Sequence, residues 1–138
     1  MKLHILTENQ EPVENFKKII ISSNTIATSE ISDNECSFIL ANDALDSFSV
    51  ENVEKFVQEV TKKLRINGTM VVGGTDIRLF CKYVTNGMIN EPDASKIIDS
   101  KQSMTTLNET VNLIGSLGLA IESTQIRGIH YEVKAKRG

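Results

Sequence analysis

The chain has 138 residues, 15 Lys and Arg against 18 Asp and Glu, a formal net charge of −3 and no Trp. This length predicts one domain over residues 1–138, and the net charge argues against a nucleic-acid partner, which usually requires a clustered basic face. The apolar runs near the start are too short for a signal peptide or a membrane span, and two cysteines in apolar contexts, Cys36 and Cys81, indicate buried free thiols in a cytoplasmic protein.

The first third of the chain has the weakest pattern. Leu3, Ile5 and Leu6 predict a short first strand, and the polar residues 7–15 predict a loop. A second apolar run covers residues 18–21. Residues 24–34 are mostly polar and predict at most a weak strand and a turn.

Residues 37–76 predict a strand, a helix and a second strand. Residues 38–41 are apolar without alternation, as expected of a strand that is covered on both faces. Ser49 can cap a helix whose apolar residues recur at steps of three and four, namely Val50, Val53, Phe56, Val57, Val60 and Leu64. Asn67-Gly68 is expected to end this helix, and residues 70–72 form the next buried strand. Such crossovers make the strands parallel, so their polar ends share the sheet edge where ligands bind.

Three further helices and a hairpin follow in the predicted order. Asp76 can cap a helix with apolar positions at Ile77, Phe80, Cys81, Val84 and Met88, and Asn86-Gly87 is expected to end it. Glu91-Pro92 opens a short second helix, and Thr106 to Glu109 match a capping box for a third helix, which ends at Gly118. Residues 119–126 and 129–135 predict two antiparallel strands joined at Arg127-Gly128, with His130 on the wetter face.

The order of these segments resembles class I S-adenosylmethionine-dependent methyltransferases. The motifs that carry the resemblance are ILANDALDSF, KKLRINGTMVV, TDIRLFCKYV and LIGSLGLAIESTQIRGIHYEVKAKR, and they cover roughly residues 35–137. The resemblance implies an α/β fold, a Rossmann-like three-layer sandwich with a mostly parallel sheet and a C-terminal antiparallel hairpin, in which the N-terminal part is truncated.

The resemblance also implies site residues at the ends of the strands. Candidate contacts to S-adenosylmethionine are Thr7, Glu8, Ser22, Ser23, Asn42 and Asp43. Candidate residues of the substrate pocket are Asp46, Thr75 and Asp76. No metal is expected, because His4 and His130 stand in predicted strands without Cys or His partners at the spacing of metal ligands.

Each of these assignments has a structural alternative. The sequence has no Gly before Gly68, so side chains crowd the place where a glycine-rich loop would approach the cofactor. The preferred interpretation of Glu8 is a solvated loop acid, and Asn42-Asp43 can equally well form the turn between strand and helix. Asp46 and Asp76 also suit the first turn of a helix, Asp76 as an N-cap. Gly73-Gly74 is too short a motif to indicate a phosphate site, and we expect it to let the chain leave the strand tightly.

Two functions of different class follow. One is an S-adenosylmethionine-dependent methyltransferase with an unknown acceptor. The other is a non-catalytic methyltransferase-like module that acts in protein association. In the second case the sheet face near the first strands has little helical cover, which predicts a homodimer. A nucleotide-binding module of another doubly wound family explains the terminal hairpin less well.

Overall fold

The structure, a computed structural model, describes residues 1–7, 10–21 and 30–138. Its centre is one six-stranded sheet with the strand order β2-β1-β3-β4-β6-β5. The strands are β1 (Lys2–Leu6), β2 (Lys17–Ile20), β3 (Cys36–Ala41), β4 (Leu64–Thr75), β5 (Leu119–Arg127) and β6 (His130–Arg137). The helical segments are the 3₁₀ helix η1 (Ala44–Ser47), α1 (Val50–Lys63), α2 (Ile77–Thr85), α3 (Glu91–Asp99) and α4 (Leu107–Ser116).

The sheet has the mixed topology that the sequence predicts. Strand β1 pairs in parallel with β2 and β3, and β3 pairs in parallel with β4. Strand β6 is antiparallel to both β4 and β5, so the chain ends in the expected hairpin. From β1 the sheet continues to β2 on one side and to β3 on the other. The carboxyl ends of β1 and β3 therefore flank the topological switch point, where open α/β sheets bind ligands.

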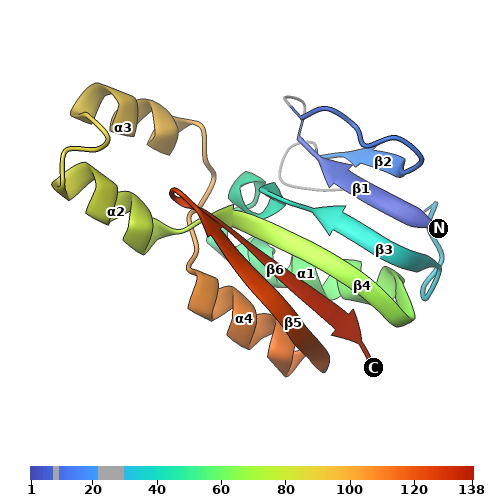
Figure 1. Cartoon of the computed structure of the whole chain (residues 1–138). Helices are drawn as coiled ribbons and strands as arrows, with labels where there is room; N and C mark the ends of the chain where they lie inside the picture. The colour runs from blue at the N-terminus through green and yellow to red at the C-terminus, as the bar shows by residue number, and fades with distance from the viewer. Residues whose placement is uncertain (8–9, 22–29) are drawn as a thin grey trace.

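The main core lies between this sheet and two helices, α1 and α4, on one of its faces (Figure 1). Val57 and Val60 of α1 and Ile114 of α4 are buried in one cluster with the strand residues Ile39, Met70 and Val133. The helical stripe predicted for α1 is mostly confirmed. The prediction that Val50 belongs to the buried stripe is wrong, because this residue is 74% exposed.

The end of α1 differs from the prediction. The helix stops at Lys63, and the next residue, Leu64, is already extended and pairs with Cys36 of β3. Asn67 does hold a left-handed conformation, with φ of 67°, but it does so inside β4. Burial of Leu64 as a strand residue therefore ends the helix one turn before the Asn-Gly signal.

Helices α2 and α3 form an arm beyond the sheet edge where β4 ends (Figure 1). Phe80, Ala94 and Ile129 make a second, smaller core there. Ile77 at the start of α2 is 43% exposed, and Cys81 is exposed as well, which corrects the expectation that both cysteines are buried. Cys36 is buried, and this burial raises the pKa of its thiol.

The opposite face of the sheet carries no helix within the described residues. The expected third layer is represented there by residues 10–16, since the ring of Phe16 packs edge-on against Phe38 with 5.8 Å between centroids. It also lies 6.5 Å from the ring of His4. No helix in the described part of the chain has the length and apolar character needed to cross a membrane.

Candidate functional site

The crevice between the ends of β1 and β3 is spanned by the side chain of Gln10. Its Oε1 accepts a hydrogen bond from the backbone N–H of Thr7 at 2.9 Å, and its Nε2 donates to the carbonyl oxygen of Asn42 at 3.1 Å. Thr7 follows β1 and Asn42 follows β3. The Gln10 amide therefore ties together the two strand ends that border the switch point. We call this pair of hydrogen bonds the Gln10 bridge.

A buried pair of polar side chains lies beside the bridge. His4 is 3% exposed, and its Nδ1 accepts a hydrogen bond from the backbone N–H of Val13, so the ring proton of the neutral form is on Nε2. His4 Nε2 and Asn42 Oδ1 are both buried without a hydrogen bond of ordinary geometry. Burial lowers the pKa of His4, and the neighbouring Asn42 side chain opposes part of that change. The two orphaned atoms are thus complementary to each other, one donor and one acceptor.

Asp43 and His130 meet at the other side of the β3 end. Asp43 has a left-handed backbone with φ of 59°, and its carboxylate makes no capping hydrogen bond to η1. Its Oδ1 lies 3.4 Å from Nδ1 of His130, which begins β6. Both side chains are nearly half exposed, so solvent can reach the pair. The fold thus brings together a carboxylate and an imidazole from residues 43 and 130, which are 87 positions apart in the sequence.

Asp46 is the buried centre of a second polar group. Its carboxylate accepts hydrogen bonds from the backbone N–H and the Oγ1 of Thr75, each at 2.7 Å. Lys101, which follows α3, places its ammonium 3.1 Å from Asp46 Oδ2. The Thr75 Oγ1 also lies 3.5 Å from Nδ1 of His130, so this group adjoins the Asp43–His130 pair. Asp46 is 4% exposed, and Lys101 balances its charge.

Asp76 serves the backbone of two helices. Its Oδ1 accepts from the N–H groups of Arg78 and Leu79, which makes it the N-cap of α2, as its sequence position predicts. Its Oδ2 accepts from the N–H of Leu107 at the start of α4. The carboxylate thereby joins the arm to the main core, and its oxygens face backbone N–H groups.

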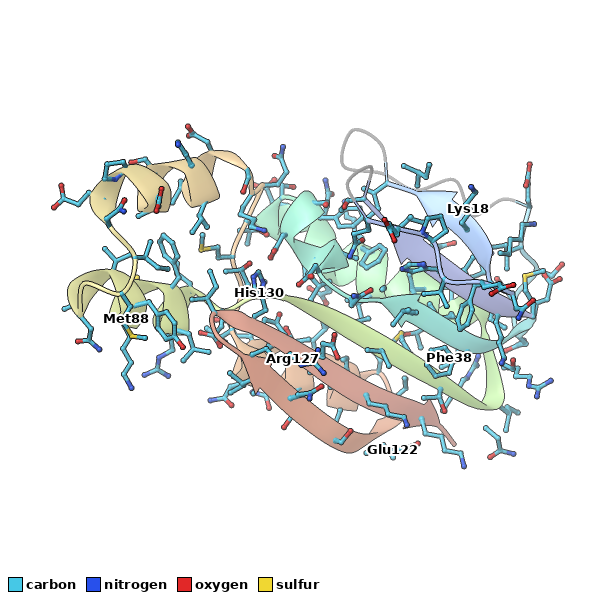
Figure 2. All side chains as sticks on the ribbon, turned by 45° about the horizontal axis from the view of Figure 1, so that its top comes forward. Lys18, Phe38, Met88, Glu122, Arg127 and His130 are labelled. Carbon is cyan, nitrogen blue, oxygen red and sulfur yellow. The ribbon has the colours of Figure 1, made fainter. Side chains whose placement is uncertain are left out.

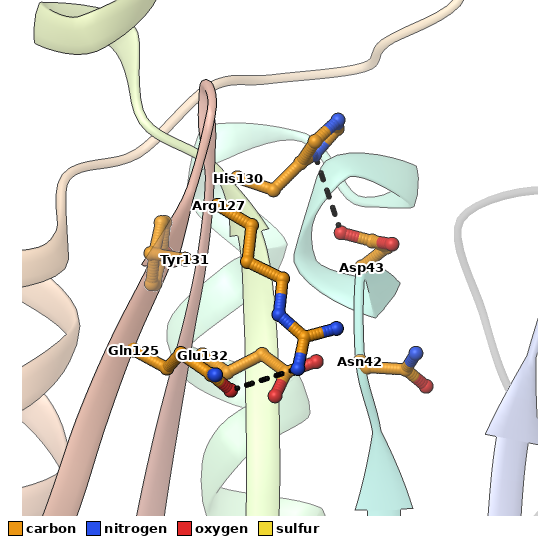
Figure 3. Close-up of a pocket in the computed structure, with 7 residues that line it drawn as sticks. All are labelled: Asn42, Asp43, Gln125, Arg127, His130, Tyr131 and Glu132. Atoms are coloured by element: carbon orange, nitrogen blue, oxygen red, sulfur yellow. Dashed lines mark hydrogen bonds and ion pairs between the residues drawn. The ribbon is translucent and has the colours of Figure 1, made fainter.

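A shallow cavity of about 190 Å³ opens beside these groups. It is lined by Asn42, Asp43, Gln125, Arg127, His130, Tyr131 and Glu132. Figure 3 shows Arg127 and Glu132 reaching in from the hairpin and Asn42 and Asp43 from the end of β3. The Arg127 guanidinium donates to Gln125 at 3.4 Å.

The structure brings together four of the nine residues predicted for the site, and a fifth, Asp76, caps α2 instead. Asn42, Asp43, Asp46 and Thr75 adjoin one another, and Thr7 contributes only through the Gln10 bridge. Glu8, Ser22 and Ser23 lie outside the described residues. Sequence reasoning missed Gln10, Lys101, Arg127 and His130. Only the position of the hairpin turn, which ends beside β4 at the carboxyl edge, could have indicated the last two.

A metal ion has one possible set of ligands in the described part of the chain. Single ligand atoms of Asp43, Asp46 and His130 lie within 4.8 Å of one another. The sequence predicted no Cys or His partner for His130, and the partners that the structure brings to it are carboxylates, from η1 and from the turn before it. The ammonium of Lys101 already pairs with Asp46, which lowers the negative charge that this set offers to an ion.

Comparison with known proteins places the fold. No protein family and no curated protein matches the sequence. An O-methyltransferase family protein from Burkholderia thailandensis superimposes with a TM-score of 0.63 at 10% identity, over 88% of this chain and 36% of that one. A possible histamine N-methyltransferase from Thermotoga maritima superimposes with a TM-score of 0.60 at 13% identity, over 89% of this chain and 65% of that one. An S-adenosylmethionine-dependent methyltransferase from Mesorhizobium loti superimposes with a TM-score of 0.62 at 12% identity, over 92% of this chain and 72% of that one.

These likenesses show the fold of class I S-adenosylmethionine-dependent methyltransferases over about 90% of the chain. They confirm the predicted fold family and the mostly parallel sheet with its terminal antiparallel strands. The chain spans about a third of the length of the Burkholderia protein and about two thirds of the Thermotoga one.

The described residues do not fit the cofactor that this fold implies. The backbone N–H of Thr7, directly after the first strand, is bound to Gln10 Oε1 and is therefore not free to meet the carboxylate of the cofactor's amino-acid end. The Gln10 bridge also occupies the space between the ends of β1 and β3, where a ligand at the switch point would lie. Asn42 Oδ1 is a buried acceptor near this place without a hydrogen bond, but its natural donor is His4 Nε2, which is also buried without one, and not a group of the cofactor.

Proposed function

We propose that this chain is a methyltransferase-like module that works by binding a protein partner and not by transferring a methyl group. The Gln10 bridge is the observation that carries this proposal, because it closes the switch-point crevice with the chain's own side chain. The absence of Gly before Gly68 in the sequence supports it, since backbone cannot approach a ligand as closely there. Free thiols at Cys36 and Cys81 are consistent with action in the cytoplasm.

Isothermal titration with S-adenosylmethionine and S-adenosylhomocysteine tests this proposal. We expect no saturable heat up to ligand concentrations of about 1 mM. A dissociation constant of that size corresponds to a binding free energy of about −4 kcal/mol. Saturable binding that Asp43→Ala weakens, and that the exposed control Asp99→Ala leaves intact, would place the cofactor at the β3 end and reject the proposal.

A second candidate is an active S-adenosylmethionine-dependent methyltransferase with an unknown acceptor. The Asp43–His130 pair favours it, because a partly exposed imidazole beside a carboxylate at the carboxyl edge suits proton removal from an acceptor. Methyl transfer mainly requires alignment of acceptor and donor, so few catalytic groups are needed. The same titration separates the two candidates, since only this one requires cofactor affinity.

A further inference from the structure

The sheet face opposite α1 and α4 has a defined set of side chains, which we call the open face. Cross-strand partners share a face, and the register therefore assigns its members. Lys18 pairs with His4, which pairs with Leu40; Leu40 pairs with Val71, and Val71 with Lys134. The same reasoning adds residues of β3, β4, β5 and β6. His4 and Leu6 of β1 belong to this face but are buried, and Val13 and Phe16 contact His4. The members that are at least partly exposed, which we keep as the open face, include Lys18, Ile20, Phe38, Leu40, Thr69, Val71, Arg127, Glu132, Lys134 and Lys136.

An apolar strip runs across the middle of the open face. Phe38, Leu40 and Val71 stand next to one another on β3 and β4, and each is only half-buried. Ile20 at the β2 edge is 50% exposed. Parallel strands are normally covered on both faces, because each face carries apolar side chains that water solvates poorly. Phe16 packs edge-on against Phe38 at one end of the strip, but no helix of the described residues covers Leu40 and Val71 as Val57 and Ile114 cover the other face.

Basic side chains flank this strip. Lys134 and Lys136 lie beside it on β6, Arg127 lies at its hairpin end, and all three are exposed. Figure 2 shows Lys18, Phe38 and Arg127 around this face. Glu132 is the one carboxylate among the open-face residues defined above, whereas the whole chain has a net charge of −3. The open face is thus basic on an acidic protein.

We propose that the open face binds an amphipathic α-helix from a partner protein, with an apolar stripe over Phe38, Leu40 and Val71 and acidic residues paired with Lys134 and Lys136. A helix is the element that covers sheets in α/β folds, and its apolar stripe matches the width of two strands. Acidic flanks follow from charge complementarity with the lysines. This inference rests on the proposed function and names the chemistry of the partner.

Two other occupants fit the open face less well. A second copy packed face to face would bring Lys134 and Lys136 of both copies together, and like charges at an interface oppose association. Single-stranded nucleic acid binds basic surfaces through stacking on aromatic rings, but Leu40 and Val71 at the centre of the strip are aliphatic. The homodimer expected from the sequence therefore becomes an outcome of the test.

The test uses two labelled helical peptides of about 18 residues, each with Leu at i, i+3, i+4 and i+7. Glu fills the flanks of one peptide and Lys fills the flanks of the other. Fluorescence anisotropy with the full chain should show binding of the acidic peptide at least tenfold tighter than of the basic one. Raised salt should weaken this binding, because the lysines are exposed.

Matched charge reversals locate the binding. The double variant Lys134→Glu with Lys136→Glu should lower affinity for the acidic peptide about tenfold or more. The control variant Lys55→Glu with Lys96→Glu changes exposed lysines of α1 and α3 by the same charge and should leave affinity unchanged. Equal affinity for both peptides, no binding of either, or equal effects of both double variants would overturn the proposal.

Two further measurements complete the design. Tight binding of a single-stranded oligothymidylate, lost in the β6 double variant, would assign the face to nucleic acid and overturn the proposal. So would a dimer in sedimentation that the same variant dissociates or strengthens. Failure here is distinct from failure of the proposed function. If the chain binds both the acidic peptide and S-adenosylmethionine, the docking surface stands and the non-catalytic assignment is rejected. If the chain binds neither, the docking surface is rejected and the non-catalytic assignment stands.

Discussion

Gln10 illustrates how one side chain can join the ends of two neighbouring strands. Its amide offers an acceptor to Thr7 and a donor to Asn42, which are the two kinds of backbone group that line the crevice. A residue without hydrogen-bonding groups could not do this. The same backbone groups would otherwise be open to solvent or to a small molecule.

Asp46 is expected to be a structural residue of the site. Asp46→Ala leaves the Thr75 N–H and the Lys101 ammonium without their acceptor, and we expect a loss of about 2–3 kcal/mol in the free energy of unfolding. Urea denaturation measures it. Asp99→Ala, an exposed carboxylate, is the control and should change the value by less than about 0.5 kcal/mol. An equal, small effect of both variants would show that the Asp46 contacts add little stability.

His4 makes stability depend on pH. Its folded-state pKa lies below the ordinary value of 6.5, because burial disfavours the charged ring. The unfolded chain therefore binds a proton first as the pH falls. The stabilising contribution is complete above 6.5 and is lost as the pH falls towards the lowered pKa of the folded state. Urea denaturation between neutral and mildly acidic pH should show a smaller pH dependence for His4→Gln than for the original chain.

If His4→Gln kept the full pH dependence of the original chain, the buried ring would not be its source.

At the scale of elements, Gly73 and Gly74 permit close packing within β4. A Cβ at Gly73 would lie 2.3 Å from the carbonyl oxygen of Tyr131, and one at Gly74 would lie 2.9 Å from Asp46 Oδ1. Both residues lie inside the strand and have no positive φ. The pair therefore serves neither a phosphate nor a tight exit from the strand. It lets β6 and Asp46 approach the β4 backbone.

Gly73→Ala should accordingly destabilise the fold strongly. The clash is with backbone of the partner strand, which cannot move without breaking the β4–β6 ladder, so we expect a loss of about 2–4 kcal/mol. Gly115→Ala is the contrast, because nothing lies within 4 Å of its Cβ position in α4. That change should add up to about 1 kcal/mol. Thermal unfolding of the two variants in the same direction would contradict the packing described here.

Elements were predictable where their signals are local. The N-caps at Asp76 and Thr106 and the turn before His130 all depend on residues within a few positions, and the structure confirms each of them. Of the capping box predicted at Thr106, the structure shows the hydrogen bond from the Glu109 N–H to Thr106 Oγ1. The end of α1 was not predictable in this way. It depends on the pairing of Leu64 with Cys36 of β3, which lies 28 positions earlier in the sequence.

The whole molecule shows why the fold was easier to predict than the site. The succession of apolar runs and helices, together with the resemblance of their order to a known family, predicted a mostly parallel sheet with a terminal antiparallel hairpin, and the structure confirms it. The site depends on contacts between distant segments, such as His130 with Asp43 and Gln10 with Asn42. No spacing rule relates these residues, since only the folded sheet brings them together.

Nuclear magnetic resonance of the isotope-labelled chain with S-adenosylhomocysteine tests the central claim most directly. The side-chain amide of Gln10 and the backbone N–H of Thr7 report on the closed crevice. If the crevice is filled by the chain's own side chain, both signals should stay in place up to about 1 mM ligand. Saturable shifts of both signals, with the Gln10 amide released from Asn42, would contradict the account.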